Sequence, residues 1–267
     1  MPRPVIALLT DFGVRDHYVG TMKGVALTIC PEATLVDISH EVPPHDVVAG
    51  ALELAACYRY FPSGTVFLVV VDPGVGSSRR GIAGETGDYK FVGPDNGVLS
   101  VVFDDTPPKR VVELTERRYA RPTVSRTFEG RDRFAPAAAW LAKGAELSAF
   151  GRPAGPVHRL ELSPPKVEPD RIVGEVWRVD RFGNLITNID RKTFEKLGSV
   201  EHWPALEIRV GPHQVSKVVS TYADASAGEV CALFGSSDHL EIAANGASAA
   251  SQLDLGRGAE VHVIRRG

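Results

Sequence analysis

An aspartate and an arginine flank a glycine-rich turn in the segment VFLVVVDPGVGSSRR, residues 66–80. Asp72 follows six apolar residues, and Arg79 comes seven positions later, after Pro73, Gly74 and Gly76. A rigid Pro-Gly turn can bring the guanidinium back to the carboxylate, where the pair could orient a small polar molecule. An aspartate after a strand can also simply cap a turn, but the arginine beyond this turn favours a functional role for Asp72.

A second aspartate holds a similar position earlier in the chain. Asp11 follows the apolar run VIALLT, residues 5–10. In open α/β sheets, the carboxyl ends of parallel strands face the ligand crevice. Asp11 and Asp72 are therefore expected at one edge of the sheet, although for Asp11 a role as a simple turn cap is equally compatible with the sequence.

Three further stretches combine polar side chains with glycine turns, and each also has a structural explanation. RTFEGRDRFAP, residues 126–136, could be the charged start of a helix. DRFGNLITNI, residues 180–189, could be an Asx-type turn. FGSSDHLEIAANGAS, residues 234–248, could be an ordinary polar hairpin. Their candidate functional residues are Glu129, Asp180, Asn184, Ser236, Glu241 and Asn245.

Alternating strand and helix patterns precede these stretches. Strands are expected at residues 5–10, 34–38 and 65–71, and helices at 16–29 and 43–61. The third strand is apolar throughout, as expected where helices cover both faces of a parallel sheet. Residues 81–103 predict a hairpin that runs into a loop. We predict an α/β domain over residues 1–150 with a largely parallel sheet.

The composition changes after residue 150. Residues 151–170 contain five prolines and little periodicity, which predicts a linker. Beyond it, short runs such as HQVSKVV and HLEIAA alternate with period two between glycine turns. This pattern predicts a smaller all-β, barrel-like domain over residues 171–267.

Composition and motifs exclude several functions. The formal net charge is -3 and no Lys- or Arg-rich run occurs, so nucleic acid is not an expected partner. The apolar run near the N-terminus is too short for a signal peptide or a membrane span, and three scattered cysteines suit a cytoplasmic protein. No metal-ligand spacing, dinucleotide-binding glycine loop, P-loop or nucleophile elbow is present.

Taken together, these stretches resemble the S-adenosyl-L-methionine (SAM) hydroxide adenosyltransferases, or adenosine-forming SAM hydrolases, which are relatives of the fluorinases and chlorinases. The resemblance spans nearly the whole chain. It is carried by LLTDFGxxDxYVGxMKG, FPSGTVFLVVVDPGVGSSRR, GPDNG, TFEGRDRFAP, DRFGNLITNI and HLEIAANGASAA, in this order.

The resemblance implies a fold, an assembly and a reaction. The fold is a seven-stranded α/β N-terminal domain with a β-barrel-like C-terminal domain. The assembly is a homotrimer whose active sites lie between the N-terminal domain of one subunit and the C-terminal domain of its neighbour. The reaction is an SN2 attack of water at the ribose C5′ of SAM, which yields adenosine and L-methionine without a metal or other cofactor.

The resemblance also implies roles for individual residues. Asp72 and Arg79 match two members of a water-activating Asp–Arg–His triad. Asp11 is expected at the ribose hydroxyls, because a carboxylate can accept two hydrogen bonds from a diol. The remaining implied substrate contacts are Asp16 and Asp180 near the methionine amine, Asn184 and Asn245 at the adenine edge, Ser236 and Glu241 at the methionine end, and His45 where the fluorinases place an aromatic over the ribose.

One position departs from the family. The third triad member is normally a histidine before Gly130, and this chain has Glu129. We hypothesise that Glu129 and Asp72 share Arg79, that Glu129 serves as a base, and that the local formal charge of -1 favours the cationic sulfonium. Two alternatives stay open: a SAM- or adenosine-binding protein with weak or no turnover, and a halide-using enzyme, which the two carboxylates disfavour by repelling anions.

Overall fold

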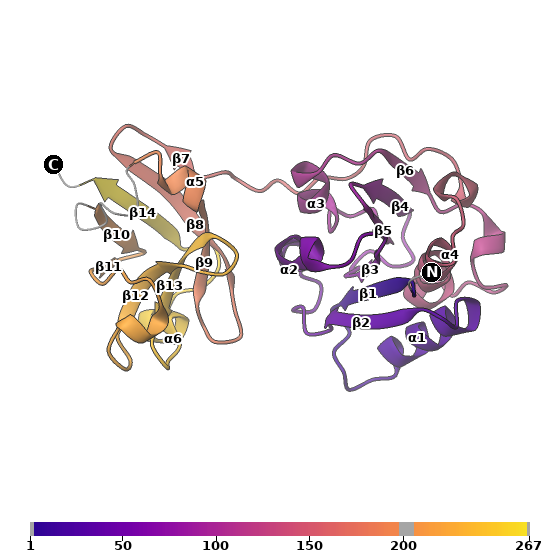
Figure 1. The fold of residues 1–267 in the computed structure, drawn as a ribbon, viewed down its shortest axis with the longest axis horizontal. Helices are drawn as coiled ribbons and strands as arrows, with labels where there is room; N and C mark the ends of the chain where they lie inside the picture. Colours follow the sequence, from indigo (N-terminus) through magenta and orange to yellow (C-terminus); the bar gives the residue numbers. More distant parts are fainter. Residues whose placement is uncertain (1–2, 198–205, 266–267) are drawn as a thin grey trace. The chain divides into compact units, whose positions relative to one another are not determined.

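The computed structural model describes residues 3–197 and 206–265, and the chain divides into two compact units, Met1–Glu161 and Leu162–Gly267 (Figure 1). The boundary lies inside the proline-rich segment 151–170. Residues 1–2, 198–205 and 266–267 belong to the expected domain ranges but lie outside the described residues.

The first unit is built on a mixed sheet of six strands in the order β2-β1-β3-β5-β4-β6. The four strands β2, β1, β3 and β5 run parallel, whereas β4 pairs antiparallel with both β5 and β6. The expectations of a largely parallel sheet and of seven strands are therefore corrected to a mixed, six-stranded sheet among the described residues. The strands are β1 (Val5–Thr10), β2 (Thr34–Ser39), β3 (Val66–Val70), β4 (Gly81–Thr86), β5 (Tyr89–Pro94) and β6 (Arg110–Glu113).

The mixed pairing follows from a tight hairpin. Strands β4 and β5 are joined by Gly87 and Asp88 alone, and Gly87 has a φ of 54°. Two-residue loops with positive φ connect antiparallel neighbours, so β4 must run against β5. The predicted hairpin is confirmed, and a short helix, α3 (Ser100–Asp105), follows it.

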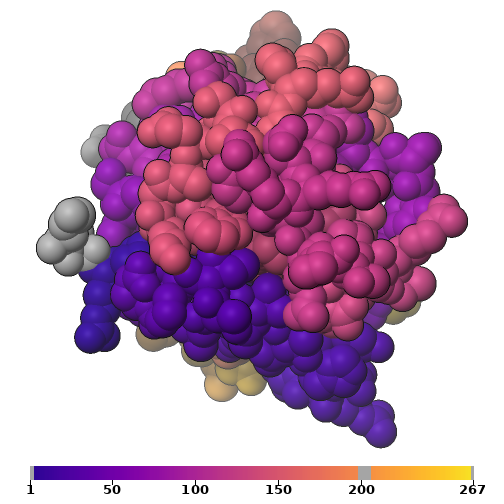
Figure 2. Space-filling model, turned by 90° about the vertical axis from the view of Figure 1, so that its right-hand side faces the viewer, coloured from indigo at the N-terminus to yellow at the C-terminus, as the bar shows by residue number. Residues whose placement is uncertain are grey.

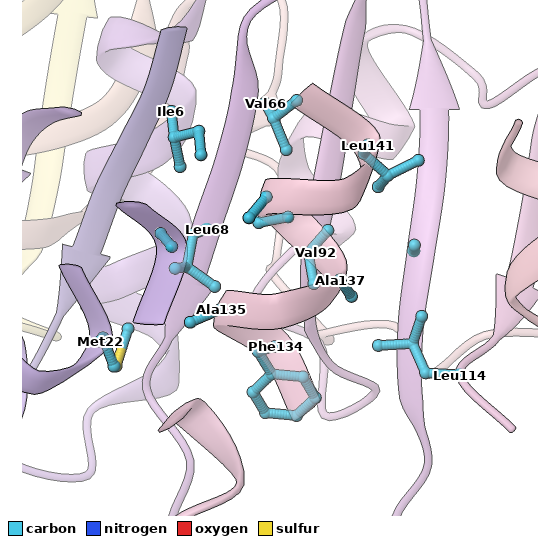
Figure 3. Close-up of a cluster of buried hydrophobic side chains, with 14 of the residues drawn as sticks. Ile6, Met22, Val66, Leu68, Val92, Leu114, Phe134, Ala135, Ala137 and Leu141 are labelled. Atoms are coloured by element: carbon cyan, nitrogen blue, oxygen red, sulfur yellow. The ribbon is translucent and has the colours of Figure 1, made fainter. Parts of the chain in front are cut away.

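Alternate side chains of the central strands enter two separate cores. Leu8 and Leu68 pack in one hydrophobic cluster with Met22 and Phe134, whereas Leu9 and its neighbours pack in the other. Figure 3 shows the first cluster, where the Ala-rich α4 crosses the strands closely. Every residue of β3 is buried, which explains its unbroken apolar sequence.

Helices cover both faces of this sheet. Helices α1 and α4 pack together over one core, and α2 and α3 pack together over the other. Figure 2 shows a face of the first unit where the N-terminal part of the chain, in indigo, adjoins later segments in magenta and pink. The helices are α1 (Tyr18–Ile29), α2 (Val47–Cys57), α4 (Ala135–Ala142), the 3-10 turns η1 (Tyr58–Tyr60), η2 (Arg117–Tyr119) and η4 (Leu147–Phe150), and the π-helix η3 (Gly130–Phe134).

The chain stays attached to the first unit as far as Glu161. Pro153 forms a β-bridge with Val112, and the Arg80 guanidinium donates to the carbonyls of Ala154 and Pro156. Asp95 binds Arg80 and accepts from the backbone N–H of His158 at 2.8 Å. The GPDNG stretch therefore fixes the outgoing chain.

The second unit is an antiparallel, nearly closed barrel-like sheet. Its strand order is β11-β10-β14-β8-β9-β13-β12, with β7 added to β8. The segment after β11 forms backbone hydrogen bonds with Ala232 of β12, so the first and last strands of this sheet are connected. The elements are β7 (Lys166–Val167), β8 (Arg171–Val179), β9 (Leu185–Asp190), α5 (Arg191–Phe194), β10 (Leu206–Val210), β11 (His213–Val215), η6 (Tyr222–Asp224), β12 (Val230–Phe234), β13 (His239–Ala244), α6 (Ala249–Leu253) and β14 (Glu260–Arg265).

Candidate active site

Asp72 and Arg79 form a bidentate ion pair at the carboxyl end of β3. Arg79 Nε donates to Asp72 Oδ1 at 2.8 Å, and Arg79 Nη2 donates to Asp72 Oδ2. The side chains are only 5% and 9% exposed, and the guanidinium lies 5.2 Å from the centre of the Phe134 ring. The glycine-rich turn therefore returns Arg79 to Asp72, as the sequence predicted.

Glu129 contacts the same arginine from a different segment. Arg79 Nη2 lies 2.8 Å from Glu129 Oε2, within ion-pair distance. Glu129 Oε2 is buried and has no hydrogen-bond partner among residues 3–197 and 206–265. Arg133 Nη1 donates to the other oxygen, Oε1, at 3.3 Å. Glu129 therefore has one oxygen in a hydrogen bond and one that can still accept a proton or a hydrogen bond.

Close packing fixes the backbone around Glu129. It directly precedes η3, and π-turns of this kind often occur at functional sites. A Cβ at Gly130 would lie 3.1 Å from Met22 Sδ, so a side chain here would require Met22 to shift slightly. Phe128 packs edge-on to Phe12 and Tyr18, which connects the Glu129 segment to the loop that carries Asp11.

The charges in this cluster balance. Asp72 and Glu129 contribute -2, while Arg79 and Arg133 contribute +2, so the formal sum is zero. The expected local charge of -1 is wrong, because Arg133 was not counted. Burial alone would lower the pKa of Arg79, but the hydrogen bonds and charges of Asp72 and Glu129 outweigh it and raise that pKa, so Arg79 stays protonated.

Asp11 lies at the same sheet edge as Asp72. Thr10 pairs with Val70 in the parallel register of β1 and β3, so the two aspartates leave adjacent strands on one side. Asp11 Oδ2 accepts from the backbone N–H of His45 at 2.8 Å, and His45 has a φ of 68°. The side chains of His45 and Asp16 are exposed.

A polar network that the sequence did not single out supports the Asp11 loop. Thr10 Oγ1 and His40 Nδ1 are 2.9 Å apart and buried, and His40 Nε2 lies 3.0 Å from Asp37 Oδ1. The carbonyl of His40 also accepts from Gly13 N at 2.7 Å. Burial opposes the charge on Asp37, but Lys23 and His40 lower its pKa overall. His40 is therefore a buried histidine with a polar neighbour at each ring nitrogen.

Asp180 and Asn184 interact within one turn of the second unit. Asp180 Oδ1 accepts from the backbone N–H groups of Phe182 and Asn184, each at 2.9 Å, and Oδ2 accepts from Asn184 Nδ2 at 2.9 Å. The Asx-type turn is therefore present. It holds the buried Asn184 side chain in place and leaves Phe182 76% exposed at the tip.

Glu241 is buried on β13, where Tyr222 donates to its Oε2 at 2.9 Å. Burial raises the pKa of Glu241, and the negative charge of Asp180 adds to this effect against the opposing hydrogen bond from Tyr222. Burial and Glu241 likewise raise the pKa of Tyr222. Tyr222 was not among the predicted residues, and its spacing from Glu241 offered no sequence signal.

The remaining predicted residues lie on loops of the second unit. Ser236 is exposed in the turn between β12 and β13. Asn245 follows β13, and its Nδ2 donates to the carbonyl of Ala225 at 2.7 Å. The candidate residues are thus divided between two units, with Asp72, Arg79, Glu129, Asp11, Asp16 and His45 in the first and Asp180, Asn184, Ser236, Glu241 and Asn245 in the second.

The described residues contain neither a cluster of metal-ligating side chains nor a helix that could span a membrane. Across residues 3–197 and 206–265, no three His, Cys, Asp or Glu side chains gather as they do around a metal ion. No helix in the same ranges is both long enough and apolar enough to cross a membrane.

Both parts of the chain match models of known domains. Residues 6–151 match the SAM hydroxide adenosyltransferase N-terminal domain, and residues 174–262 match the corresponding C-terminal domain. The chain belongs to the SAM hydroxide adenosyltransferase family. The resemblance inferred from its motifs is thereby confirmed.

Named relatives of this adenosyltransferase-family chain include hydrolases and halogenating enzymes. The (R)-S-adenosyl-L-methionine hydrolases of Salinispora tropica and Thermus thermophilus are each 38% identical to it, over 98% of this chain and 98% and 100% of theirs. A fluorinase of Nocardia brasiliensis is 32% identical over 98% of this chain and 97% of its own. A solved structure of an uncharacterized conserved protein from Thermotoga maritima superimposes with a TM-score of 0.92 at 39% identity, covering 97% of this chain and 100% of that one.

Proposed function

We propose that this family member hydrolyses SAM to adenosine and L-methionine. The observation that carries the proposal is the alignment of almost the entire chain, at 38% identity, with proteins named as SAM hydrolases. The buried Asp72–Arg79–Glu129 cluster supports it, because the cluster supplies charge and an open acceptor at a sheet edge where α/β domains bind ligands. The relatives' names favour the (R) epimer at sulfur as the substrate.

In the proposed reaction, a water oxygen attacks C5′ of the ribose opposite the sulfur. The O–C5′ bond forms as the C5′–S bond breaks, and the electron pair of that bond stays on the methionine sulfur. The water loses one proton, so SAM and water give adenosine, methionine and a proton. Water is a weak nucleophile, and its activation depends on positioning and fixed charge more than on a strong base.

The cluster assigns a separate task to each side chain. Arg79 stabilises negative charge that develops on the water oxygen, and Asp72 fixes Arg79 and orients the water. Glu129 Oε2, which accepts no hydrogen bond from the described residues, receives the proton. This role fits the family's histidine position, because a neutral imidazole nitrogen is also an acceptor.

We further propose substrate contacts, assembly and setting as the family resemblance implies them. Asp11 binds the ribose hydroxyls, and His45 lies beside the ribose. The chain forms a homotrimer in the cytoplasm, acts without metal or cofactor, and completes each site with the C-terminal domain of a neighbouring subunit. That domain contributes Asp180 near the methionine amine, Asn184 and Asn245 at the adenine, and Ser236 and Glu241 at the methionine. Asp16 of the N-terminal domain also lies near the methionine amine.

Incubation with SAM in oxygen-18 water tests this function. The expected products are methionine and adenosine that carries the label at its 5′ oxygen, detected by mass spectrometry. Adenosine without label would contradict direct attack of water at C5′. Heat-inactivated protein controls for the spontaneous breakdown of SAM.

The fluorinase relatives make halide transfer a second candidate. Under this alternative, added chloride or fluoride would yield 5′-halo-5′-deoxyadenosine in the same assay. We expect adenosine alone, because the carboxylates of Asp72 and Glu129 are paired with Arg79 and would repel a halide ion. Tight binding of adenosine without release of methionine would instead indicate a binding protein that has lost turnover.

A further inference from the structure

Arg133 connects Glu129 to the main chain of the sheet. Its Nη1 donates to Glu129 Oε1 at 3.3 Å, and its Nη2 donates to the carbonyl of Leu114 at 2.6 Å, just beyond β6. The Arg133 side chain is 25% exposed and its partner Glu129 only 11%. One guanidinium therefore holds a buried carboxylate against a fixed backbone atom.

The neighbouring arginines of this turn bind other groups. Arg131 forms two hydrogen bonds, each 2.7 Å long, with Asp132, and Arg121 lies 3.3 Å from the same carboxylate. Arg79 donates twice to Asp72, and its Nη2 also lies 2.8 Å from Glu129 Oε2. Arg133 binds the other oxygen of Glu129, Oε1.

We propose that Arg133 is a positioning residue that acts through Glu129, and this inference rests on the proposed hydrolase function. By binding Oε1, Arg133 fixes the rotation of the carboxylate and leaves Oε2 beside Arg79, available for the attacking water. It also brings the cluster to electrical balance. Without Arg133, two buried carboxylates would share one guanidinium, and the formal charge would fall to -1.

Two consequences follow for a chain that lacks this guanidinium. The Glu129 carboxylate loses its hydrogen bond to Arg133 and turns both oxygens toward Arg79. Glu129 then competes with Asp72 for the donor groups of Arg79. Both effects reduce the rate of the chemical step and leave the binding of SAM nearly unchanged.

Steady-state kinetics of Arg133→Gln, Arg133→Lys and Arg118→Gln test the proposal. We expect Arg133→Gln to lower kcat about 10- to 100-fold, because small misplacements of a reacting group cost rate on this scale. KM should change little. Arg133→Lys should recover part of the rate, since it keeps the charge. Arg118, exposed over the Tyr119 ring, provides a charge-matched control that should retain full activity.

A double-mutant comparison separates positioning from a general structural role. If Arg133 acts through Glu129, Arg133→Gln should change kcat less than about twofold in a Glu129→Gln background. Equal losses in both backgrounds, or a loss confined to KM, would overturn the proposal. Thermal unfolding of each variant identifies losses that come from unfolded protein.

A structural measurement keeps this inference separate from the hydrolase function. Wild-type protein that releases no adenosine would contradict the function alone. Crystal structures of wild type and Arg133→Gln then still test the positioning. We expect the Glu129 carboxylate to rotate toward Arg79 in the variant, and an unchanged carboxylate would refute the role of Arg133.

Discussion

Arg79 and Arg80 are adjacent in the sequence but bind different partners. Arg79 turns toward Asp72 and Glu129 in the candidate active site, whereas Arg80 binds Asp95 and the carbonyls of the outgoing chain. The two side chains have the same charge and similar geometry. A substitution made at each position in turn therefore distinguishes a role in the reaction from a role in the fold.

We expect Arg79→Lys to lower kcat for adenosine release about 100-fold, because an ammonium ion cannot bind Asp72 through two parallel donors and contact Glu129 as well. Arg80→Lys should reduce stability and leave kcat close to the wild-type value. Steady-state assays and urea denaturation of both variants provide the comparison. Equal kcat losses at the two positions would show that Arg79 has no special part in the reaction.

Glu241 gives a residue-level prediction about pH. Its pKa is raised above the usual 4.5 in the folded chain, so the fold favours its protonated form. Below pH 4.5 both folded and unfolded chains carry the proton, and no stability is lost. As pH rises, ionisation of the buried carboxyl destabilises the fold.

Glu241→Gln should therefore raise the denaturation midpoint at about pH 7 and have little effect near pH 4. Glu229 offers a control with the opposite sign, because a backbone hydrogen bond from Ser226 lowers its pKa. Glu229→Gln should lower the midpoint at neutral pH and approach wild type in acid. The measurement is urea denaturation followed by circular dichroism, and a Glu241→Gln midpoint below wild type at neutral pH would contradict the assignment.

Sequence patterns predicted the main charged pair but not all of its partners. Asp72 and Arg79 were predictable because a short rigid turn limits where the second side chain can go. Arg133 was not, because a Glu and an Arg four residues apart usually form an exposed pair on a helix surface. Here the turn is a π-helix that faces the sheet, so the pair is largely buried. Only the three-dimensional packing distinguishes these cases.

At the scale of elements, the ends of β1 and β2 support the loop that carries Asp11. Thr10 and His40 are hydrogen-bonded side by side at this edge, and Asp11 is the next residue along the chain. The buried Thr65 makes a partly buried hydrogen bond to the carbonyl of Pro62 at 2.7 Å, at the opposite end of the sheet before β3. The two threonines form a matched pair, one near the proposed site and one remote from it.

Thr10→Val should cost about 1–3 kcal/mol of unfolding free energy, because the buried His40 Nδ1 loses its hydrogen bond. Thr65→Val should cost less, because the Pro62 carbonyl still accepts from the backbone N–H of Thr65 at 3.2 Å. Thr10→Val should also raise KM for SAM several-fold, since it loosens the loop that presents Asp11. Thr65→Val should leave KM unchanged. Denaturation and kinetics of both variants test this, and an unchanged KM for Thr10→Val would show that the loop does not depend on the Thr10–His40 contact.

The element predictions succeeded where local signals are strong. The apolar run of β3 and the helical spacing of α1 and α2 identified these elements close to their observed bounds. The direction of pairing at the far edge was harder to predict. Strand β4 contains two glycines in six residues and β6 has only four residues, so neither carries a clear pattern. Their antiparallel order depends on the Gly87 turn and on long-range packing.

At the scale of the whole molecule, each unit has its own hydrophobic core and its own set of candidate residues. The first unit holds the charged cluster around Arg79, and the second holds the Asp180–Asn184 turn. In the proposed trimer, one site takes its residues from two different subunits. This arrangement predicts that two inactive variants can complement each other.

The two variants are Arg79→Lys, which damages the first unit, and Asn184→Ala, which damages the second. Each alone should form an inactive or weakly active trimer. Mixed trimers, made by co-expression and purified through two affinity tags, should recover activity, because about one of the three sites in each mixed trimer would combine two intact units. If each site instead uses both units of one chain, every site carries one substitution and no activity returns. Co-expression of Arg79→Lys with itself under the two tags controls for the effect of the tags.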